Sequence, residues 1–163
     1  MAIRNIVTKG EPILRKVCRP VEEFNERLFV LLDDMRETLI DSNGVGLAAP
    51  QVGVMRRVVL VDTSDEIVEM INPEILSADG KQTGIEGCLS IPGKYGMVTR
   101  PNHVKAKYQN RAGEWCEIEG TELTARAICH ECDHLEGRLY IDVADRMLTD
   151  EELERLDRQE GDS

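Results

Sequence analysis

The hydrophobic positions of residues 21–42 follow the period of an α-helix. Apolar side chains recur every three or four residues, and acidic side chains and arginine occupy many of the positions between them. The apolar positions are Phe24, Leu28, Leu31, Leu32, Met35 and Leu39. The Asn43-Gly44 pair that follows is typical of a helix end, because both residue types tolerate a left-handed backbone. A long amphipathic helix is therefore predicted over residues 21–42.

Four shorter segments have the composition of β-strands. Arg57–Asp62 is rich in valine, and Ile67–Asn72 follows it after a polar Thr-Ser-Asp-Glu turn. Val104–Gln109 and Trp115–Glu119 flank a second turn, of sequence Asn-Arg-Ala-Gly. Each pair of segments is predicted to form an antiparallel hairpin.

A second helix is predicted over residues 121–136, and a short C-terminal helix is predicted to begin after Thr149. Thr121 is a candidate N-cap, and Gly137 is a candidate C-terminal stop. Thr149 with Glu152 predicts a capping box. Because hairpins and helices do not alternate as βαβ units, the predicted fold class is α+β with antiparallel sheets.

Composition limits the classes of protein to consider. The 163 residues suit one domain that spans residues 1–163. The net charge of −11 argues against a dedicated nucleic-acid site on a broad basic surface. No apolar run approaches the ~20 residues of a membrane span, and the first residues lack the pattern of a secretory signal. With an odd number of cysteines, five, we expect reduced thiols and a cytoplasmic location.

The candidate chemistry is concentrated in the predicted helix 121–136. His130 and His134 lie four residues apart, so they share one helix face, and Glu131 directly follows the first. Two imidazoles on one face can bind one metal ion, and the adjacent carboxylate can take a proton from a metal-bound water. The same pattern also arises by chance on helix surfaces, so a metallohydrolase needs a third ligand.

Several residues compete for the role of third ligand. One class of zinc endopeptidase has a third histidine where this chain has Tyr140, and another takes a glutamate from a later helix. The glutamates of the predicted last helix fit a solvated surface better than a ligand role. Cys88 offers a thiolate, which binds zinc or ferrous iron strongly, although an isolated cysteine is more often a buried structural thiol. Cys129 and Cys132 interleave with the histidines on one helix, and we expect them to pack in the core.

The glycine-rich segment Gly44–Ala49 has the letters of a dinucleotide-binding fingerprint but not its context. That fingerprint should follow a strand and open a helix, whereas this segment follows a helix and is closed by Pro50. Two interpretations remain. The segment is either a tight turn into a strand, or a loop that brings its backbone near a substrate and presents the Gln51 amide as a hydrogen-bond donor.

Three segments in this order, Gly44–Gln51, Glu86–Ser90 and His130–His134, resemble the three signature motifs of the peptide deformylase family. The resemblance extends over essentially the whole chain. It implies an α+β fold with antiparallel sheets packed around a central metal-binding helix. It also implies a hydrolase of the bacterial cytoplasm that removes the N-formyl group from the N-terminal formyl-methionine of nascent polypeptides and releases formate.

The resemblance implies the metal site as well. The ligands would be Cys88, His130 and His134, and they would hold one divalent metal ion. Ferrous iron is the ion expected in the cell, with zinc, nickel or cobalt as alternatives. Glu131 would act as general acid and base while a metal-bound hydroxide attacks the formyl carbon.

Further residues are expected to contact the substrate. The Leu89 backbone N–H and the Gln51 side chain are expected to donate hydrogen bonds to the developing oxyanion, and Gly46 is expected to pair with the extended peptide through its backbone. The candidates for the methionine pocket are Val45, Leu123 and Ala127. Ordinary core packing is the alternative for these three. Near the site, Asp133 is expected to form an ion pair with Arg100.

Two other functions compete with deformylation. One is a zinc endopeptidase of the HExxH type, and the other is a non-catalytic paralogue that binds metal or formylated peptides without turnover. A transient contact with the ribosome is left open. Residues 148–163 hold seven acidic and two basic side chains, and this charge disfavours contact of the tail with ribosomal RNA.

Overall fold

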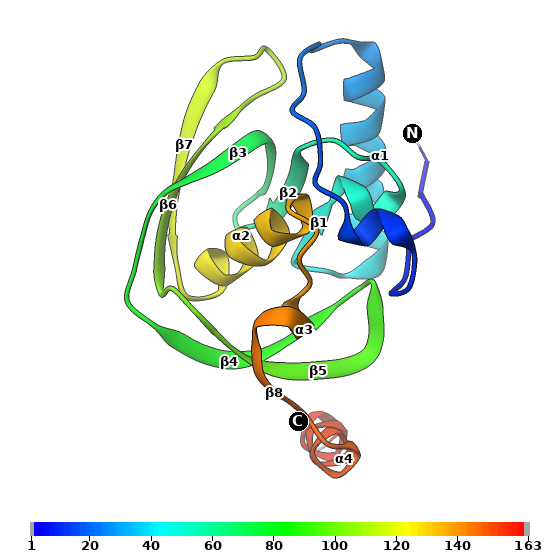
Figure 1. The fold of residues 1–163 in the computed structure, drawn as a ribbon, viewed down its shortest axis with the longest axis vertical. Coiled ribbons are helices and arrows are strands. Elements are labelled where there is room, and N and C mark those ends of the chain that lie inside the picture. The colour runs from blue at the N-terminus through cyan, green and yellow to red at the C-terminus, as the bar shows by residue number, and fades with distance from the viewer. Residues whose placement is uncertain (1, 162–163) are drawn as a thin grey trace.

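Helix α2 lies near the centre of the structure, with two antiparallel β-sheets and helix α1 around it (Figure 1). The structure, a computed structural model, describes residues 2–161. The helices are η1 Pro12–Arg15, α1 Glu26–Ser42, η2 Ala49–Val52, α2 Glu122–Leu135, α3 Tyr140–Val143 and α4 Asp150–Gly161, where η marks a 3-10 helix. The strands are β1 Gly46–Ala48, β2 Val58–Asp62, β3 Ile67–Asp79, β4 Gln82–Cys88, β5 Ile91–Arg100, β6 His103–Gln109, β7 Trp115–Thr121 and β8 Ala144–Met147. The predicted α+β fold is thereby confirmed.

The larger sheet has the strand order β1-β2-β3-β6-β7. Both predicted hairpins are confirmed, because β2 pairs antiparallel with β3 and β6 pairs antiparallel with β7. Strand β3 continues beyond the predicted end at Asn72 and pairs with β6 as far as Asp79. A register shift follows Ile71, and the residues from Glu74 onward are exposed. This half of β3 therefore lacks the apolar alternation by which a strand is recognised.

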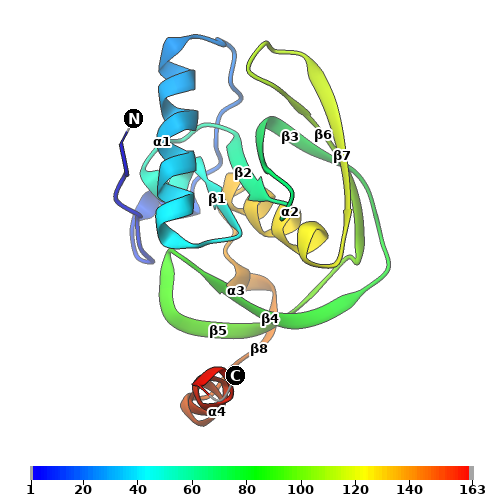
Figure 2. The same ribbon diagram turned by 180° about the vertical axis from the view of Figure 1, so that it is seen from behind.

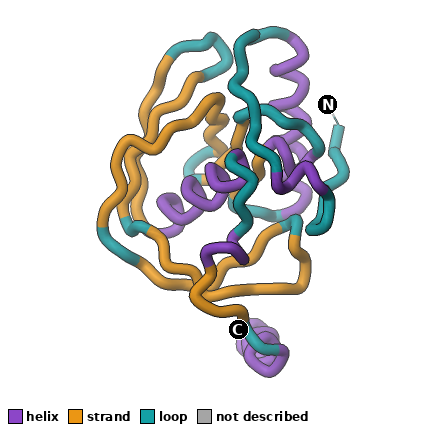
Figure 3. Tube along the Cα trace, in the orientation of Figure 1, coloured by secondary structure: helices purple, strands orange, loops and turns teal. Residues whose placement is uncertain are grey.

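The smaller sheet, of order β4-β5-β8, was not predicted. Its strands carry four glycines and Pro92, which dilute the β-branched residues that signal a strand. Figure 3 shows these strands in orange, passing below α2 in that view. Strand β4 ends at Cys88, so this sheet delivers one of the candidate metal ligands.

Helix α1 begins at Glu26 rather than at residue 21. Asn25 is its N-cap, and the Asn25 side chain accepts a hydrogen bond of 3.2 Å from the Leu28 backbone N–H. The residues before it are extended because the Val21 N–H donates to the Asn72 side chain at 2.8 Å. The apolar face of α1 packs on β1 and β2, which places α1 on the outside of the sheet (Figure 2).

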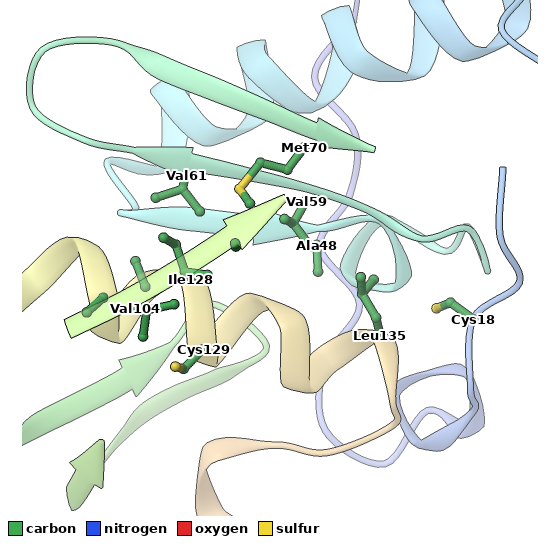
Figure 4. Close-up of a cluster of buried hydrophobic side chains, with 12 residues drawn as sticks. Cys18, Ala48, Val59, Val61, Met70, Val104, Ile128, Cys129 and Leu135 are labelled. Atoms are coloured by element: carbon green, nitrogen blue, oxygen red, sulfur yellow. The ribbon is translucent and has the colours of Figure 1, made fainter. Parts of the chain in front are cut away.

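One face of α2 is buried against the larger sheet. Ile128, Cys129 and Leu135 of α2 belong to one apolar cluster with residues of several strands (Figure 4). The strand residues of this cluster are Ala48, Val59, Val61, Met70, Val104 and Ala106. Because this packing fixes the rotation of α2, the histidines on another face are held in one direction, toward Cys88.

At the C-terminal end of α2 the predicted stop is present, whereas at its N-terminal end the predicted side-chain cap is not. Thr121 stands at the N-cap position but makes no side-chain capping bond, because it is also the last residue of β7 and pairs with His103. The Glu122 N–H instead donates to the Asn102 carbonyl at 3.0 Å. Gly137 follows the helix with φ of 74°, which confirms it as the stop.

Helix α4 follows β8 and lies apart from the sheets at the lower edge of Figure 1. The predicted capping box is confirmed. The Glu152 N–H donates to Thr149 Oγ1 at 3.2 Å, and the Thr149 N–H donates to the Glu152 carboxylate at 3.1 Å. Within residues 2–161, none of the helices combines the length and apolar character that a membrane span requires.

Replacing Gly137 with alanine should destabilise the fold in two ways. Its positive φ disfavours any L side chain, and an added Cβ would lie 2.6 Å from the Arg15 carbonyl oxygen. We expect Gly137→Ala to lower the free energy of unfolding by about 2–4 kcal/mol, measured by urea denaturation. The control is Gly53→Ala, where φ is 83° but nothing lies within 4 Å of the added Cβ. It should cost about 1–2 kcal/mol. Equal losses would show that the Arg15 contact does not matter.

Candidate metal centre and active site

Three candidate metal ligands converge where the end of β4 meets α2. Cys88 ends β4, and His130 and His134 lie on successive turns of α2. Their ligand atoms all lie within 4.8 Å of one another, and Cys88 Sγ is 3.4 Å from His134 Nε2. Both histidines are buried and the cysteine is partly buried. One sulfur and two imidazole nitrogens at this separation suit zinc, ferrous iron and similar divalent ions.

The orientation of His130 is set by Glu86. The Nδ1 atom of His130 lies 2.8 Å from Glu86 Oε1. Because an ionised carboxylate only accepts hydrogen bonds, Nδ1 carries the proton and Nε2 keeps its lone pair for a ligand. A carboxylate partner of this kind commonly orients a ligating histidine. His134 directs Nε2 toward Cys88, and its buried Nδ1 has no hydrogen-bond partner in the described part of the chain.

Glu86 is also the centre of a buried charge network. Arg100 donates two hydrogen bonds to its carboxylate, at 3.0 and 3.1 Å, and Arg126 donates a third at 2.5 Å. Burial alone would raise the pKa of Glu86, but hydrogen bonds from His130 and Arg100 outweigh it and bring the pKa to about 2. Arg100 also donates to Asp133 at 2.7 Å, which confirms the predicted ion pair. The network joins β4, β5 and α2 through one ionised carboxylate.

No role was predicted for Glu86 or Arg126, although the sequence held a signal for the second. Arg126 stands four residues before His130, so it lies on the same face of α2. An arginine on a buried helix face needs an acidic partner, because an unpaired buried charge is strongly unfavourable. The sequence did not indicate which of the 31 acidic residues would supply it.

Glu131 is buried at the wall of the cleft. Only 4% of its surface is exposed, and Glu131 Oε1 makes no hydrogen bond within residues 2–161. Burial raises the pKa of Glu131 to about 7. The backbone of β1 passes so close that a Cβ on Gly46 would lie 2.6 Å from Glu131 Oε2. Glycine at this position therefore leaves the carboxylate room beside β1.

The Gln51 side chain is held in a fixed orientation by its neighbours. Its Oε1 atom accepts a hydrogen bond of 2.9 Å from the Ala48 N–H. Its Nε2 atom donates to Ser90 Oγ at 3.1 Å and lies 3.5 Å from Cys88 Sγ. The donor end of the amide therefore faces the candidate metal site, as expected from the loop interpretation of this segment.

A cavity of about 500 Å³ opens beside these groups. It is lined by the sequence-predicted residues Val45, Gly46, Gln51, Cys88, Leu89, Leu123, Ala127, His130 and Glu131. His134 is not part of this wall and is only 1% exposed. Val45 and Leu123 are 40% and 56% exposed, so the alternative of core packing fails for both, whereas Ala127 is buried. The structure thus brings nearly all the predicted site residues to one cleft.

The rival ligand candidates lie elsewhere or pack as core. Tyr140 stacks on the His130 ring with the centroids 6.1 Å apart, and its buried hydroxyl has no partner among the described residues. Cys129 and Cys132 pack in or against the apolar cluster of Figure 4, as predicted. Burial raises the pKa of Cys129 to about 11 and that of Cys132 to about 12, so both remain protonated thiols.

An HExxH helix, a thiol from a neighbouring strand and a buried glutamate beside a cleft are the features of a metal-dependent hydrolase site. The sequence matches a family model described as polypeptide deformylase over residues 3–149. A peptide deformylase of Agathobacter rectalis is 54% identical over 150 residues, which are 92% of this chain and 95% of that protein. The chain belongs to the polypeptide deformylase family, and it is an enzyme of that family.

Solved structures support the same assignment. The peptide deformylase of Thermotoga maritima superimposes with a TM-score of 0.87 at 42% identity, covering 89% of this chain and 99% of that one. A class I type b peptide deformylase of Acinetobacter baumannii, solved with Met-Ala-Ser bound, gives a TM-score of 0.82 at 36% identity. That match covers 87% of this chain and 98% of the other. The resemblance identified from the three motifs is confirmed.

Neutralising Glu86 should destabilise the protein strongly. Glu86→Gln would leave the buried guanidinium group of Arg126 without a carboxylate and that of Arg100 with Asp133 alone. We therefore expect a loss of about 3–5 kcal/mol in the free energy of unfolding, measured by urea denaturation at pH 7. The control is Glu117→Gln, which removes an exposed carboxylate 3.5 Å from Lys105 and should cost less than about 1 kcal/mol. A loss for Glu86→Gln as small as that of the control would contradict the central role of this network.

Proposed function

We propose that this enzyme removes the formyl group from the N-terminal formyl-methionine of nascent polypeptides and releases formate. The observation that carries the proposal is the convergence of Cys88, His130 and His134 beside Glu131 at the wall of the cleft. Family membership supports it. The tripeptide Met-Ala-Ser seen in the Acinetobacter baumannii relative has the sequence of a product of such a reaction. Membership of this family argues against the zinc endopeptidase. All three signature motifs are intact, which argues against a non-catalytic paralogue.

Cys88, His130 and His134 would hold one divalent metal ion. The donor set fits this role because it combines a partly exposed sulfur with imidazoles whose orientation is set by burial and by Glu86. When bound, the ion supplies a Lewis acid that lowers the pKa of a water molecule and polarises the formyl oxygen. We propose ferrous iron as the ion in the cell, with zinc, nickel or cobalt as ions that the same ligands accept.

Glu131 would move the proton during the reaction. Its Oε1 atom has no hydrogen-bond partner among the described residues, so it is available to accept a proton from the attacking water. The same carboxylic acid would then donate that proton to the departing amine. Gly46, which has no Cβ, leaves room for this carboxylate beside β1.

Leu89 and Gln51 would stabilise the negative charge that develops on the formyl oxygen. Both residues line the cleft next to Cys88. The Gln51 amide is already directed toward Cys88 by the hydrogen bond from the Ala48 N–H to its other end. A donor fixed before the reaction stabilises the transition state without reorganisation, and the loss of one such donor typically slows turnover by about 10²–10³-fold.

The substrate peptide would lie extended along β1. Within the described sheet, β1 pairs only with β2, so the opposite edge of β1 is free to bind a peptide backbone, with Gly46 at the centre of the contact. The methionine side chain would enter the apolar part of the cleft formed by Val45, Leu123 and Ala127. Exposed apolar side chains at a cleft are consistent with such a pocket.

The substrate implies where the enzyme works. We propose that residues 1–163 act as one catalytic unit in the bacterial cytoplasm, where formylated chains are made. Any contact with the ribosome would be transient. The first turn of α4 holds Asp150, Glu151 and Glu152, so this helix would not face ribosomal RNA.

A formate-release assay with formyl-Met-Ala-Ser tests the proposal, and Glu131→Gln tests the mechanism. Wild-type enzyme should release formate and free Met-Ala-Ser without cutting a peptide bond. Glu131→Gln should lower kcat by about 10²–10⁴-fold, because the amide cannot accept the proton, and should retain its metal. Cleavage of an internal bond would overturn the proposed function. Unchanged turnover in Glu131→Gln would remove Glu131 as the general base.

Cys88→Ala should weaken metal binding. Removing the thiolate leaves two imidazoles, which hold a divalent ion poorly. Metal analysis of protein purified without oxygen and then dialysed should find the metal in wild type and largely lost from Cys88→Ala. Cys129→Ala is the matched control, since that thiol belongs to the apolar cluster and should leave the metal content unchanged. Full occupancy in Cys88→Ala would assign the third ligand to another residue.

A further inference from the structure

A second cavity, of about 760 Å³, lies away from the catalytic cleft and shares no lining residue with it. Its walls are the extended segment before α1, the first turns of α1 and the loop that follows η2. Four arginines line it, Arg4, Arg19, Arg27 and Arg56. No part of the proposed reaction uses this cavity.

Three of these arginines have no acidic partner in the described part of the chain. Arg4 pairs with Asp34 at 2.9 Å. Among the side chains that the structure describes, by contrast, no salt bridge involves Arg19, Arg27 or Arg56, and all three are exposed. Acidic residues outnumber basic ones by 31 to 20, so partners are not scarce in this chain. Three arginines without a described acidic partner therefore lie together in one cavity of a chain whose net charge is negative.

The backbone holds two of the three side by side. Arg19 and Arg56 form a parallel β-bridge, and the Arg57 N–H donates to the Arg19 carbonyl at 3.0 Å. Directly bridged residues project from the same side of the strand pair, so like charges there repel. An anion bound between the two guanidinium groups would remove this repulsion.

The start of α1 adds positive potential to the same cavity. Asn25, the N-cap, and Leu28 of the first turn both line it. The N-terminal end of a 17-residue helix carries a partial positive charge, which favours an anion nearby. The N-terminal end of α1 and the arginines therefore both favour a negatively charged ligand.

We propose that this cavity binds a small ligand through a phosphate group. The planar guanidinium fork matches phosphate oxygens in two-point contact. Glu22 and Glu23 also line the cavity, and two carboxylates there oppose a long polyanion such as RNA while leaving a net positive site for one doubly charged phosphate group. The ligand class is therefore inorganic phosphate or a small phosphate monoester.

Isothermal titration with inorganic phosphate and with adenosine monophosphate, in 100 mM NaCl at pH 7.5, tests the proposal. At least one of the two should bind saturably with a Kd below 1 mM. The double variant Arg19→Gln/Arg56→Gln should weaken that binding at least tenfold. The control double variant Arg138→Gln/Arg158→Gln removes the same charge from exposed arginines outside the cavity and should stay within twofold of wild type. Absence of saturable binding, or equal losses in both double variants, would overturn the proposal.

Stability measurements separate a ligand site from a structural role of the arginines. In phosphate-free buffer, Arg19→Gln/Arg56→Gln should melt at or above the Tm of wild type, because it loses a repulsive pair. Added ligand at ten times its Kd should raise the Tm of wild type by about 3–5 °C and leave that of the variant unchanged. A lower Tm of the variant in phosphate-free buffer would show that the arginines stabilise the fold, which would overturn the ligand site. If an RNA oligonucleotide bound wild type more tightly than the monophosphate does, and the variant no longer bound that RNA, the proposal of a small ligand would be overturned.

Formate release should be the same in Arg19→Gln/Arg56→Gln and in wild type when no phosphate is present, because neither residue lies in the catalytic cleft. The phosphate site and the deformylase reaction are therefore tested by separate measurements. Failure of one leaves the other standing.

Discussion

The buried carboxylate of Glu86 is the interaction on which the rest of the site depends. It accepts hydrogen bonds from Arg100 on β5, Arg126 on α2 and the imidazole of His130. Without it the buried Arg126 would lose its carboxylate and Arg100 would keep only Asp133, and Glu86 would be an unfavourable buried charge without the two arginines. The network therefore fixes the smaller sheet against α2. The same contact sets the tautomer of His130, so the stability of the fold and the geometry of the metal centre share one cause.

A second constraint is the closeness of β1 to α2. The larger sheet packs on α2 through small side chains such as Ala48 and Ala125, which brings β1 up to the helix. Only a glycine at position 46 leaves room for the Glu131 carboxylate. The free edge of β1, the general base and the metal ligands thus lie around one cleft, and a peptide paired with β1 would reach the reacting groups directly.

The elements that depend only on neighbouring residues are the ones that local sequence patterns predict correctly. The two hairpins and the stop at Gly137 follow from local composition, and the structure contains them. The errors arose where distant contacts replaced local ones. The start of α1 moved because Asn72 binds the backbone of Val21, and Thr121 makes no cap because the β7 ladder holds it. The glycine-rich strands β4 and β5 are strands because they pair with each other, and no local pattern in the sequence predicts this pairing.

The sequence by itself determined which chemical groups exist and which of them share a helix face, because a spacing of four residues is a local property of the helix. It thereby placed His130, Glu131 and His134 together. Only the tertiary structure decided that Cys88, 46 positions from His134, would meet them, and that Glu86 would be their buried support. The physical reason is that contacts between distant positions depend on strand register and on the rotation of α2. Both are set by packing of the whole core rather than by the residues nearby.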